Sequence, residues 1–171
     1  RMKRIKLPAH IPVIMDGNGR WARRRFRPRA YGHRMGVQNM FKICGHAFNL
    51  GVRIVTVFAL SAENLSRPKE EVDELFELFR SYFSKKRERM FELNVKICVL
   101  GDISVLPADI QDSIGEIERA TAHLTSGLLN ICVNYGARQE LVRAVNKAVA
   151  LGRFVDENSL ESMFYTAGLP D

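Results

Sequence analysis

The sequence has few cysteines, and their placement excludes several classes of protein. Cys44, Cys98 and Cys132 lie far apart in apolar stretches, and no pair has the spacing of metal ligands. An odd number of cysteines at such distances does not suit the disulfide framework of a small secreted domain. We therefore expect reduced core cysteines and a cytoplasmic protein.

Long hydrophobic segments are also missing. No apolar run approaches the ~20 residues that a helix needs to cross a bilayer, and no signal-peptide apolar region follows the basic first residues. Repeats, low-complexity tracts and linkers are absent as well, so we expect residues 1–171 to form a single domain. With 46% apolar and 26% charged residues, the composition is that of a globular protein.

The charge of the chain is positive and clustered. The formal net charge is +7, and much of the excess lies in residues 1–6 and 20–34. A basic balance favours an anionic partner, but it does not distinguish a phosphorylated small molecule from nucleic acid or a membrane surface. The clustering favours a local anionic site.

The start of the second basic cluster has the chemistry of a phosphate site. The apolar residues 11–15 suit a buried strand, and Asp16, Gly17 and Gly19 form a turn directly after it. Glycines let backbone N–H groups converge on an anion, Arg20 adds a charged planar fork, and Asp16 suits Mg²⁺. The stretch predicts a diphosphate site at the carboxyl end of a strand. The same residues also suit an ordinary tight turn or a basic arm for nucleic acid.

Strands and helices alternate along the whole chain. Apolar runs predict strands at residues 11–15, 54–60, 95–100 and 128–133. Periodicity and capping signals predict helices at about residues 36–50, 69–93, 108–122, 139–151 and 157–166, with a loop or broken helical piece at 23–30. This order predicts an α/β fold with a mainly parallel central sheet and helices on both faces.

Polar loops follow three of these strands, at residues 16–20, 61–67 and 134–138. The carboxyl ends of parallel strands lie along one edge of a sheet, so the loops can share one cleft. Asn134 and Arg138 could reach that cleft, although Arg138 can equally tie its loop to the sheet.

The predicted helix at 69–93 carries one long apolar stripe, which is core by default. Its members are Val72, Leu75, Phe76, Phe79, Phe83 and Met90.

These motifs together resemble those of the cis-prenyltransferases, the isoprenyl transferase family that includes undecaprenyl diphosphate synthase. The matching segments are HIPVIMDGNGRWA, FALSAENLSRPKEEV, GDISVLP and LNICVNYGAR, with Pro28-Arg29 and Gly32-His33 after the first. The resemblance extends from about His10 to the last residue.

The resemblance implies an activity, a cofactor and partners. The family condenses isopentenyl diphosphate units, in Z geometry, onto an allylic diphosphate such as farnesyl diphosphate, and it requires Mg²⁺. We expect a long polyprenyl diphosphate as the product, undecaprenyl diphosphate for a cell-wall lipid carrier. The stripe would then wall a hydrophobic tunnel beside the sheet. We also expect a homodimer, a peripheral membrane contact for product release, and no nucleic-acid partner.

The resemblance also implies roles for individual residues. Asp16 matches the essential acid that acts with the metal, and Asn64 matches the residue that assists proton removal. The substrate-binding positions are Gly17, Asn18, Gly19, Arg20, Trp21, Arg29, His33, Ser61, Ala62, Glu63, Leu65 and Arg67. Glu63 could equally cap and orient its loop, and the family often has tryptophan in place of Leu65 and glycine in place of Ala137.

The sequence stops before a segment that, in the family, carries further diphosphate ligands, a metal-binding glutamate and much of the dimer contact. We therefore expect a C-terminally incomplete catalytic domain that turns over little. Two other interpretations stay open: a non-catalytic partner subunit of a prenyltransferase or a truncated inactive form, and a basic nucleic-acid-binding domain. The partner subunits typically lose the acid and arginines that this chain retains. The nucleic-acid interpretation needs interleaved aromatics, and only Trp21, Phe26 and Tyr31 are available.

Overall fold

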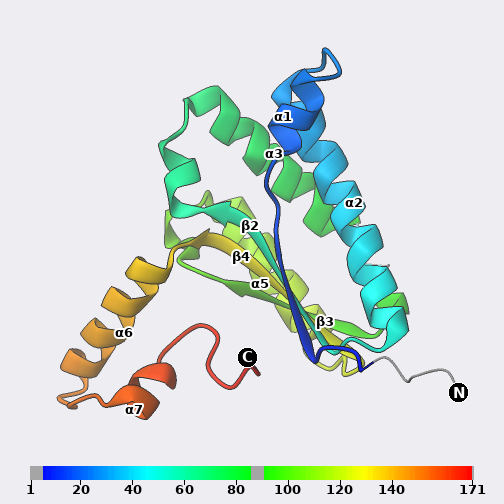
Figure 1. The fold of residues 1–171 in the computed structure, drawn as a ribbon. Coiled ribbons are helices and arrows are strands. Elements are labelled where there is room, and N and C mark those ends of the chain that lie inside the picture. The colour runs from blue at the N-terminus through cyan, green and yellow to red at the C-terminus, as the bar shows by residue number, and fades with distance from the viewer. Residues whose placement is uncertain (1–5, 86–90, 171) are drawn as a thin grey trace, which may run out of the picture.

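A parallel sheet forms the centre of the molecule. The computed structural model describes residues 6–85 and 91–170, except the side chains of residues 82–85. Within these residues the strands are β1 (His10–Ile14), β2 (Ile54–Ser61), β3 (Val95–Leu100) and β4 (Gly127–Tyr135). They lie in the order β1-β2-β4-β3, and every neighbouring pair is parallel (Figure 1). The predicted α/β fold with a parallel sheet is confirmed.

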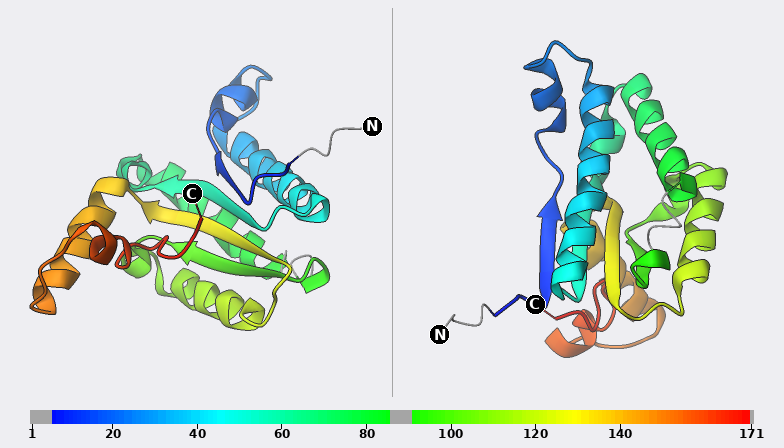
Figure 2. Two further views of the ribbon diagram at one scale, coloured as in Figure 1. Left: turned by 60° about the horizontal axis from the view of Figure 1, so that its bottom comes forward. Right: turned by 90° about the vertical axis from the view of Figure 1, so that its right-hand side faces the viewer.

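The helices differ in how they relate to the sheet. Their bounds are α1 (Asn18–Arg23), α2 (Arg29–Leu50), α3 (Lys69–Lys85), α5 (Ala108–Thr121), α6 (Ala137–Ala150) and α7 (Glu157–Glu161). Short 3₁₀ turns, η1 (Ala62–Ser66) and η2 (Ile103–Val105), follow β2 and β3. Helices α2, α3 and α5 stack on one face of the sheet, whereas α6 projects beyond it (Figure 2). The prediction of helices on both faces is therefore corrected for the described residues. No helix in the described part of the chain is long and apolar enough to cross a membrane.

The strand register explains why one face of the sheet carries the main core. Val55 is paired with Ile11 on one side and Leu129 on the other, and Leu129 is paired with Ile97. Paired residues of neighbouring parallel strands point to the same face, so these side chains form one apolar layer. They join the buried cluster to which α2, α3 and α5 contribute apolar side chains, Ile114 of α5 among them.

The opposite face is crossed by the segment that follows α6. Tyr165 stacks edge-on against Tyr135, and the Pro170 carbonyl lies 3.0 Å from His10 Nδ1. His10 Nε2 lies 2.7 Å from Thr56 Oγ1, and Asn130 Nδ2 donates to the same hydroxyl. The terminal residues thus lie against β1 and β4, as Figure 2 also shows.

Several predicted boundaries are corrected by the structure. Helix α2 begins at Arg29, seven residues before the predicted residue 36, because Pro28 (φ −62°) presets the backbone for a helix start. The residues after the glycine turn form helix α1 instead of a loop. The last helix ends at Glu161 instead of residue 166. Phe91 and Glu92 are helical, and the part of the predicted 69–93 helix at 86–90 lies outside the described residues.

Helix α1 packs closely against α2 because α2 has glycines at the contact. A Cβ built on Gly32 would lie 2.1 Å from the Asn18 carbonyl oxygen, and one on Gly36 would lie 2.5 Å from Asn18 Nδ2. Real Cβ atoms do not approach so closely, so only glycine lets the first residue of α1 rest on α2.

This close approach generates a prediction. Gly32→Ala should push α1 away from α2 and lower the free energy of unfolding by about 1–3 kcal/mol. Gly115→Ala is the matched control, because Gly115 is also helical but has no neighbouring atom within 4 Å of a built Cβ. That control should raise stability by up to about 1 kcal/mol, since alanine is the better helix former. Urea denaturation measures both variants, and equal effects would contradict the packing argument.

Candidate functional site

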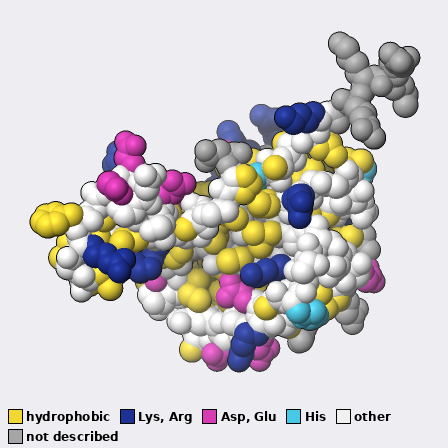
Figure 3. Space-filling model, turned by 90° about the horizontal axis from the view of Figure 1, so that it is seen from below, with side chains coloured by type: hydrophobic (Ala, Val, Ile, Leu, Met, Phe, Trp, Pro, Cys, Tyr) yellow, Lys and Arg dark blue, Asp and Glu magenta, His cyan; other side chains and the backbone are white. Residues whose placement is uncertain are grey.

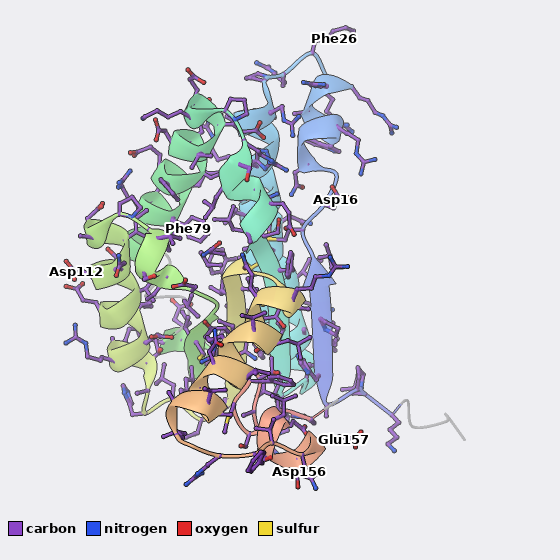
Figure 4. All side chains as sticks on the ribbon, turned by 90° about the vertical axis from the view of Figure 1, so that its left-hand side faces the viewer. Asp16, Phe26, Phe79, Asp112, Asp156 and Glu157 are labelled. Carbon is purple, nitrogen blue, oxygen red and sulfur yellow. The ribbon has the colours of Figure 1, made fainter. Side chains whose placement is uncertain are left out.

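The predicted anion loop lies where β1 ends and α1 begins. Gly17 has φ +84°, the left-handed conformation that glycine adopts at no steric cost, and its N–H donates to Asp16 Oδ1. Arg20 Nη2 lies 3.1 Å from Asp16 Oδ2, with both side chains more than 70% exposed. Asp16 and Arg20 are therefore together, as predicted, and open to solvent at the base of α1 (Figure 4).

The second predicted loop is the η1 turn after β2. The Ser61 backbone N–H donates to Asn64 Oδ1 at 3.2 Å, so the Asn64 carbonyl oxygen holds the turn while its amide N–H₂ group is left for other contacts. Hydrogen bonds from its own backbone and from the Ser61 side chain lower the pKa of Glu63, which keeps this carboxylate ionised. These contacts support the loop-orienting alternative for Glu63. Leu65 packs against the main core, and Ala62 lies near Gly136.

Glu71, which was not predicted as a site residue, gathers three of the predicted substrate-binding residues. Its Oε1 lies 2.8 Å from Arg67 Nη1, 3.2 Å from Arg29 Nη2 and 3.9 Å from His33 Nε2. The carboxylate is only 18% exposed. One carboxylate on α3 therefore gathers Arg29 and His33 of α2 and Arg67, two residues before α3. We call these four residues the Glu71 cluster.

The sequence contained a local signal for this cluster. Arg67 and Glu71 are four residues apart at the start of a helix, a spacing that allows an ion pair. The contacts from Arg29 and His33 had no such signal, because they depend on α2 and α3 packing side by side.

Two nitrogens in the cluster lack hydrogen-bond partners. Arg29 Nε and His33 Nε2 are both buried without one. Arg29 Nε lies only 3.2 Å from a Cβ built on Gly19, so Gly19 leaves room for this guanidinium beside the anion loop. Buried polar atoms are normally hydrogen-bonded, and the unpaired Arg29 N–H is a donor that an anionic ligand can satisfy.

Burial sets the charge of His33. Desolvation by burial lowers the pKa of His33. The negative charge of Glu71 opposes this shift, and the positive charges of Arg67 and Arg29 add to it. The ring is therefore neutral at pH 7 and can donate or accept a single hydrogen bond at each nitrogen.

An apolar cavity of about 80 Å³ adjoins the Glu71 cluster. It lies between β2, β4, α1, α2 and α3, next to the residue that follows β1. Its lining residues are Met15, Asn18, His33, Val37, Met40, Phe41, Ala59, Leu75, Leu78, Phe79 and Ile131. Asn18 and His33 supply its polar end, and Phe79 lines it from α3 (Figure 4). A charged cluster and a greasy cavity thus share His33.

Other predicted residues lie away from this cluster. Trp21 stacks on Tyr31, with ring centroids 6.1 Å apart. Asn134 donates to the Asp102 carbonyl at 2.7 Å, and Arg138 lines a separate groove on α6. The contact of Asn134 joins the ends of β3 and β4, so it supports the sheet edge.

The acidic groups do not form a metal centre by themselves. Among the described residues, no group of three or more His, Cys, Asp or Glu side chains is placed to hold a metal ion. Asp16 is an exposed carboxylate next to a predicted phosphate loop, and Mg²⁺ is commonly held by one or two carboxylates together with substrate phosphates. The residues therefore fit a cation that arrives with a diphosphate.

The chain is similar in sequence to prenyltransferases over nearly all its length. Residues 14–171 match the prenyltransferase family model described as undecaprenyl diphosphate synthase. An isoprenyl transferase of Clostridium tetani is 39% identical, over 96% of this chain and 68% of that protein. A tritrans,polycis-undecaprenyl-diphosphate synthase of Pyrococcus horikoshii, geranylgeranyl-diphosphate specific, is 38% identical over 100% of this chain and 68% of that protein.

The fold is similar to that of a solved enzyme over most of the chain. Lavandulyl diphosphate synthase from Lavandula x intermedia, crystallised with dimethylallyl diphosphate, superposes with a TM-score of 0.88 at 30% identity. The match covers 93% of this chain and 71% of that one.

The Glu71 cluster generates a prediction about His33. Glu71→Gln removes the negative charge that favours the imidazolium, so the pKa of His33 should fall below its value in the parent protein. Glu70→Gln is the control, because Glu70 is adjacent in sequence and has no part in the His33 shift. An NMR titration of the His33 ring measures both. An unchanged His33 pKa in Glu71→Gln would show that the cluster does not form in solution.

Proposed function

We propose, since the chain belongs to the isoprenyl transferase family of the undecaprenyl diphosphate synthases, that it joins isopentenyl diphosphate to an allylic diphosphate with Z geometry. The observation that carries the proposal is the contact between the Glu71 cluster and the apolar cavity. An allylic diphosphate has the same two parts, a polyanionic head and a hydrocarbon tail.

The head group is assigned to the anion loop and the Glu71 cluster. The Gly17–Arg20 backbone, Arg20 and Arg29 offer N–H donors from both sides of the turn between α1 and α2. The Arg67 guanidinium can add a further donor to the diphosphate, because Glu71 engages only one of its terminal nitrogens. Glu71 keeps both guanidinium groups in place before substrate binds, which lowers the ordering cost at binding.

Asp16 is the residue proposed to hold Mg²⁺, together with oxygens of the diphosphate. Bound there, the metal would neutralise part of the charge of the leaving group. Arg20 presently pairs with Asp16 Oδ2 and would turn to the phosphate oxygens when the carboxylate takes the cation.

The chemistry asks for charge stabilisation at one end and water exclusion at the other. Cleavage of the C–O bond releases diphosphate from the allylic substrate and leaves an electron-poor carbon. The double bond of isopentenyl diphosphate attacks this carbon before a proton is lost. One preorganised donor to the departing anion typically contributes ~3–4 kcal/mol, and Arg29 fills that role. The cavity side chains keep water from the reacting carbon, and Asn64 is assigned to assisting proton removal.

The cavity must enlarge to hold a prenyl tail. Its volume of about 80 Å³ is below the roughly 150 Å³ of an apolar cavity that accepts benzene. Leu75 and Phe79 must therefore move with α3 as the tail enters. A long product, undecaprenyl diphosphate, needs a tunnel between α2 and α3, and each buried CH₂ of it contributes about 0.8 kcal/mol.

Assembly as a homodimer belongs to the same proposal, as does a membrane contact for product release. Support for an assembly comes from α6, where Val142, Val145 and Val149 are exposed. Hydrophobic side chains also gather over the centre of the face seen in Figure 3 and on its projecting arm. Exposed apolar side chains that gather on one surface commonly mark interaction sites. The partner-subunit alternative is not favoured, because Asp16, Arg20, Arg29 and Arg67 are all retained.

Asp16 provides the direct test of the proposed function. Asp16→Ala should abolish the Mg²⁺-dependent part of farnesyl diphosphate binding, measured by calorimetry with and without the metal, and reduce isopentenyl incorporation by at least ~10²-fold. Asp112→Ala, an exposed carboxylate on α5, is the control and should behave like the parent. Incorporation within tenfold of the parent in Asp16→Ala would exclude the assigned role.

Phe79 tests the tunnel. Phe79→Ala should lengthen or broaden the product distribution, because it removes a ring from the cavity wall. Phe76→Ala is the control, since Phe76 packs on the same core without lining the cavity. Chromatographic sizing of the products compares the two. Identical distributions would mean that Phe79 acts only as a core residue.

A further inference from the structure

The connection between α1 and α2 forms a basic tip at one extremity of the molecule. Residues 23–27 read Arg-Arg-Arg-Phe-Arg, and all five are exposed. Figure 4 shows Phe26 at the outermost point of this connection, pointing to solvent. We call residues 23–27 the arginine tip.

Phe26 is held outward by an unfavourable backbone conformation. Its ring is 99% exposed, and its φ of +56° lies in the left-handed region that large side chains rarely adopt. Two backbone hydrogen bonds close the turn: Phe26 N–H donates to the Arg23 carbonyl, and Arg27 N–H donates to the Ala22 carbonyl. A fully exposed aromatic ring on a residue with a positive φ does not stabilise the folded monomer in water. Its position therefore suggests a contact with another partner.

The charge around Phe26 is of one sign. From residue 17 to residue 62 the sequence contains no Asp or Glu. In the described structure, no ion pair joins Arg23, Arg24, Arg25 or Arg27 to a carboxylate. An exposed aromatic ring framed by unneutralised arginines suits a surface that is anionic outside and apolar beneath.

The neighbouring aromatics make nucleic acid a poorer match. Trp21 and Tyr31 are stacked on each other, and the Arg25 guanidinium lies 4.3 Å from the Trp21 ring centroid. Arg27 lies 5.5 Å from the Tyr31 centroid. These two rings are therefore occupied by protein groups, which leaves Phe26 alone, whereas single-stranded nucleic acid is bound by several free rings along a groove.

We propose that the arginine tip docks on an anionic lipid bilayer, with the Phe26 ring inserted below the headgroups. Asp16 lies just before α1, and the arginine tip lies at the other end of this short helix (Figure 4). Docking of the tip therefore brings the diphosphate site close to the lipid surface. The idea that product is released at the arginine tip rests on the proposed function. Lipid binding by the tip does not depend on that function and is tested without substrate.

The experiment measures binding of the whole protein to vesicles of phosphatidylcholine with and without phosphatidylglycerol. Trp21, the single tryptophan, lies in the helix that precedes the tip and reports docking through its fluorescence. We expect binding only to the anionic vesicles, and its loss at high salt. Phe26→Asn should weaken it roughly tenfold, because burial of the ring is lost. Arg24→Gln should weaken it roughly fivefold, as expected for one arginine at an anionic surface.

Control variants distinguish binding by the arginine tip from non-specific binding to vesicles. Asparagine tolerates a positive φ, so Phe26→Asn should leave the thermal unfolding midpoint unchanged or raise it, and weaker binding cannot then be attributed to misfolding. Phe154→Asn is the matched control, because Phe154 is also fully exposed, follows Arg153 and lies at the far end of α6. Parent-like binding of Phe26→Asn, an equal loss in Phe154→Asn, or stronger binding to a single-stranded oligonucleotide than to anionic vesicles would each overturn the proposal.

Discussion

A single carboxylate organises the charged end of this molecule. Glu71 is mostly shielded from water and contacts Arg29 and His33, which both come from α2, and Arg67, which lies between β2 and α3. Without it, two guanidinium groups would face each other at the edge of an apolar cavity, where charge is poorly screened. The ion cluster therefore holds α2 and α3 together at the place where the cavity begins.

The close approach of α1 to α2 has a related consequence. Gly32 and Gly36 let Asn18 lie against α2, which brings the Gly17–Gly19 turn beside Arg29. The loop donors and the buried cluster thus face the same region, although they come from separate segments. A ligand bound there would satisfy Arg29 Nε, which the protein leaves unpaired. An unpaired buried donor costs stability, and such local costs are common at functional sites.

The proposed membrane contact and the proposed diphosphate site lie at opposite ends of the same short helix. Arg20 and Asp16 lie at its start, and the arginine tip follows its end. Because α1 has only six residues, the proposed lipid surface and the proposed diphosphate site are separated by under two helical turns. An amphipathic product could leave the cavity toward lipid without exposing its whole tail to water.

The sequence by itself determined the parallel α/β architecture, because continuous apolar runs such as residues 128–133 suit strands buried on both faces. It also determined the family and the turn at Asp16 and Gly17, whose residue types are local signals in the sequence. It missed the contacts of Glu71 and the start of α2 at Arg29. Those features were decided only by the tertiary structure. An ion pair across two helices, and a cavity between them, depend on distances that the order of residues does not contain.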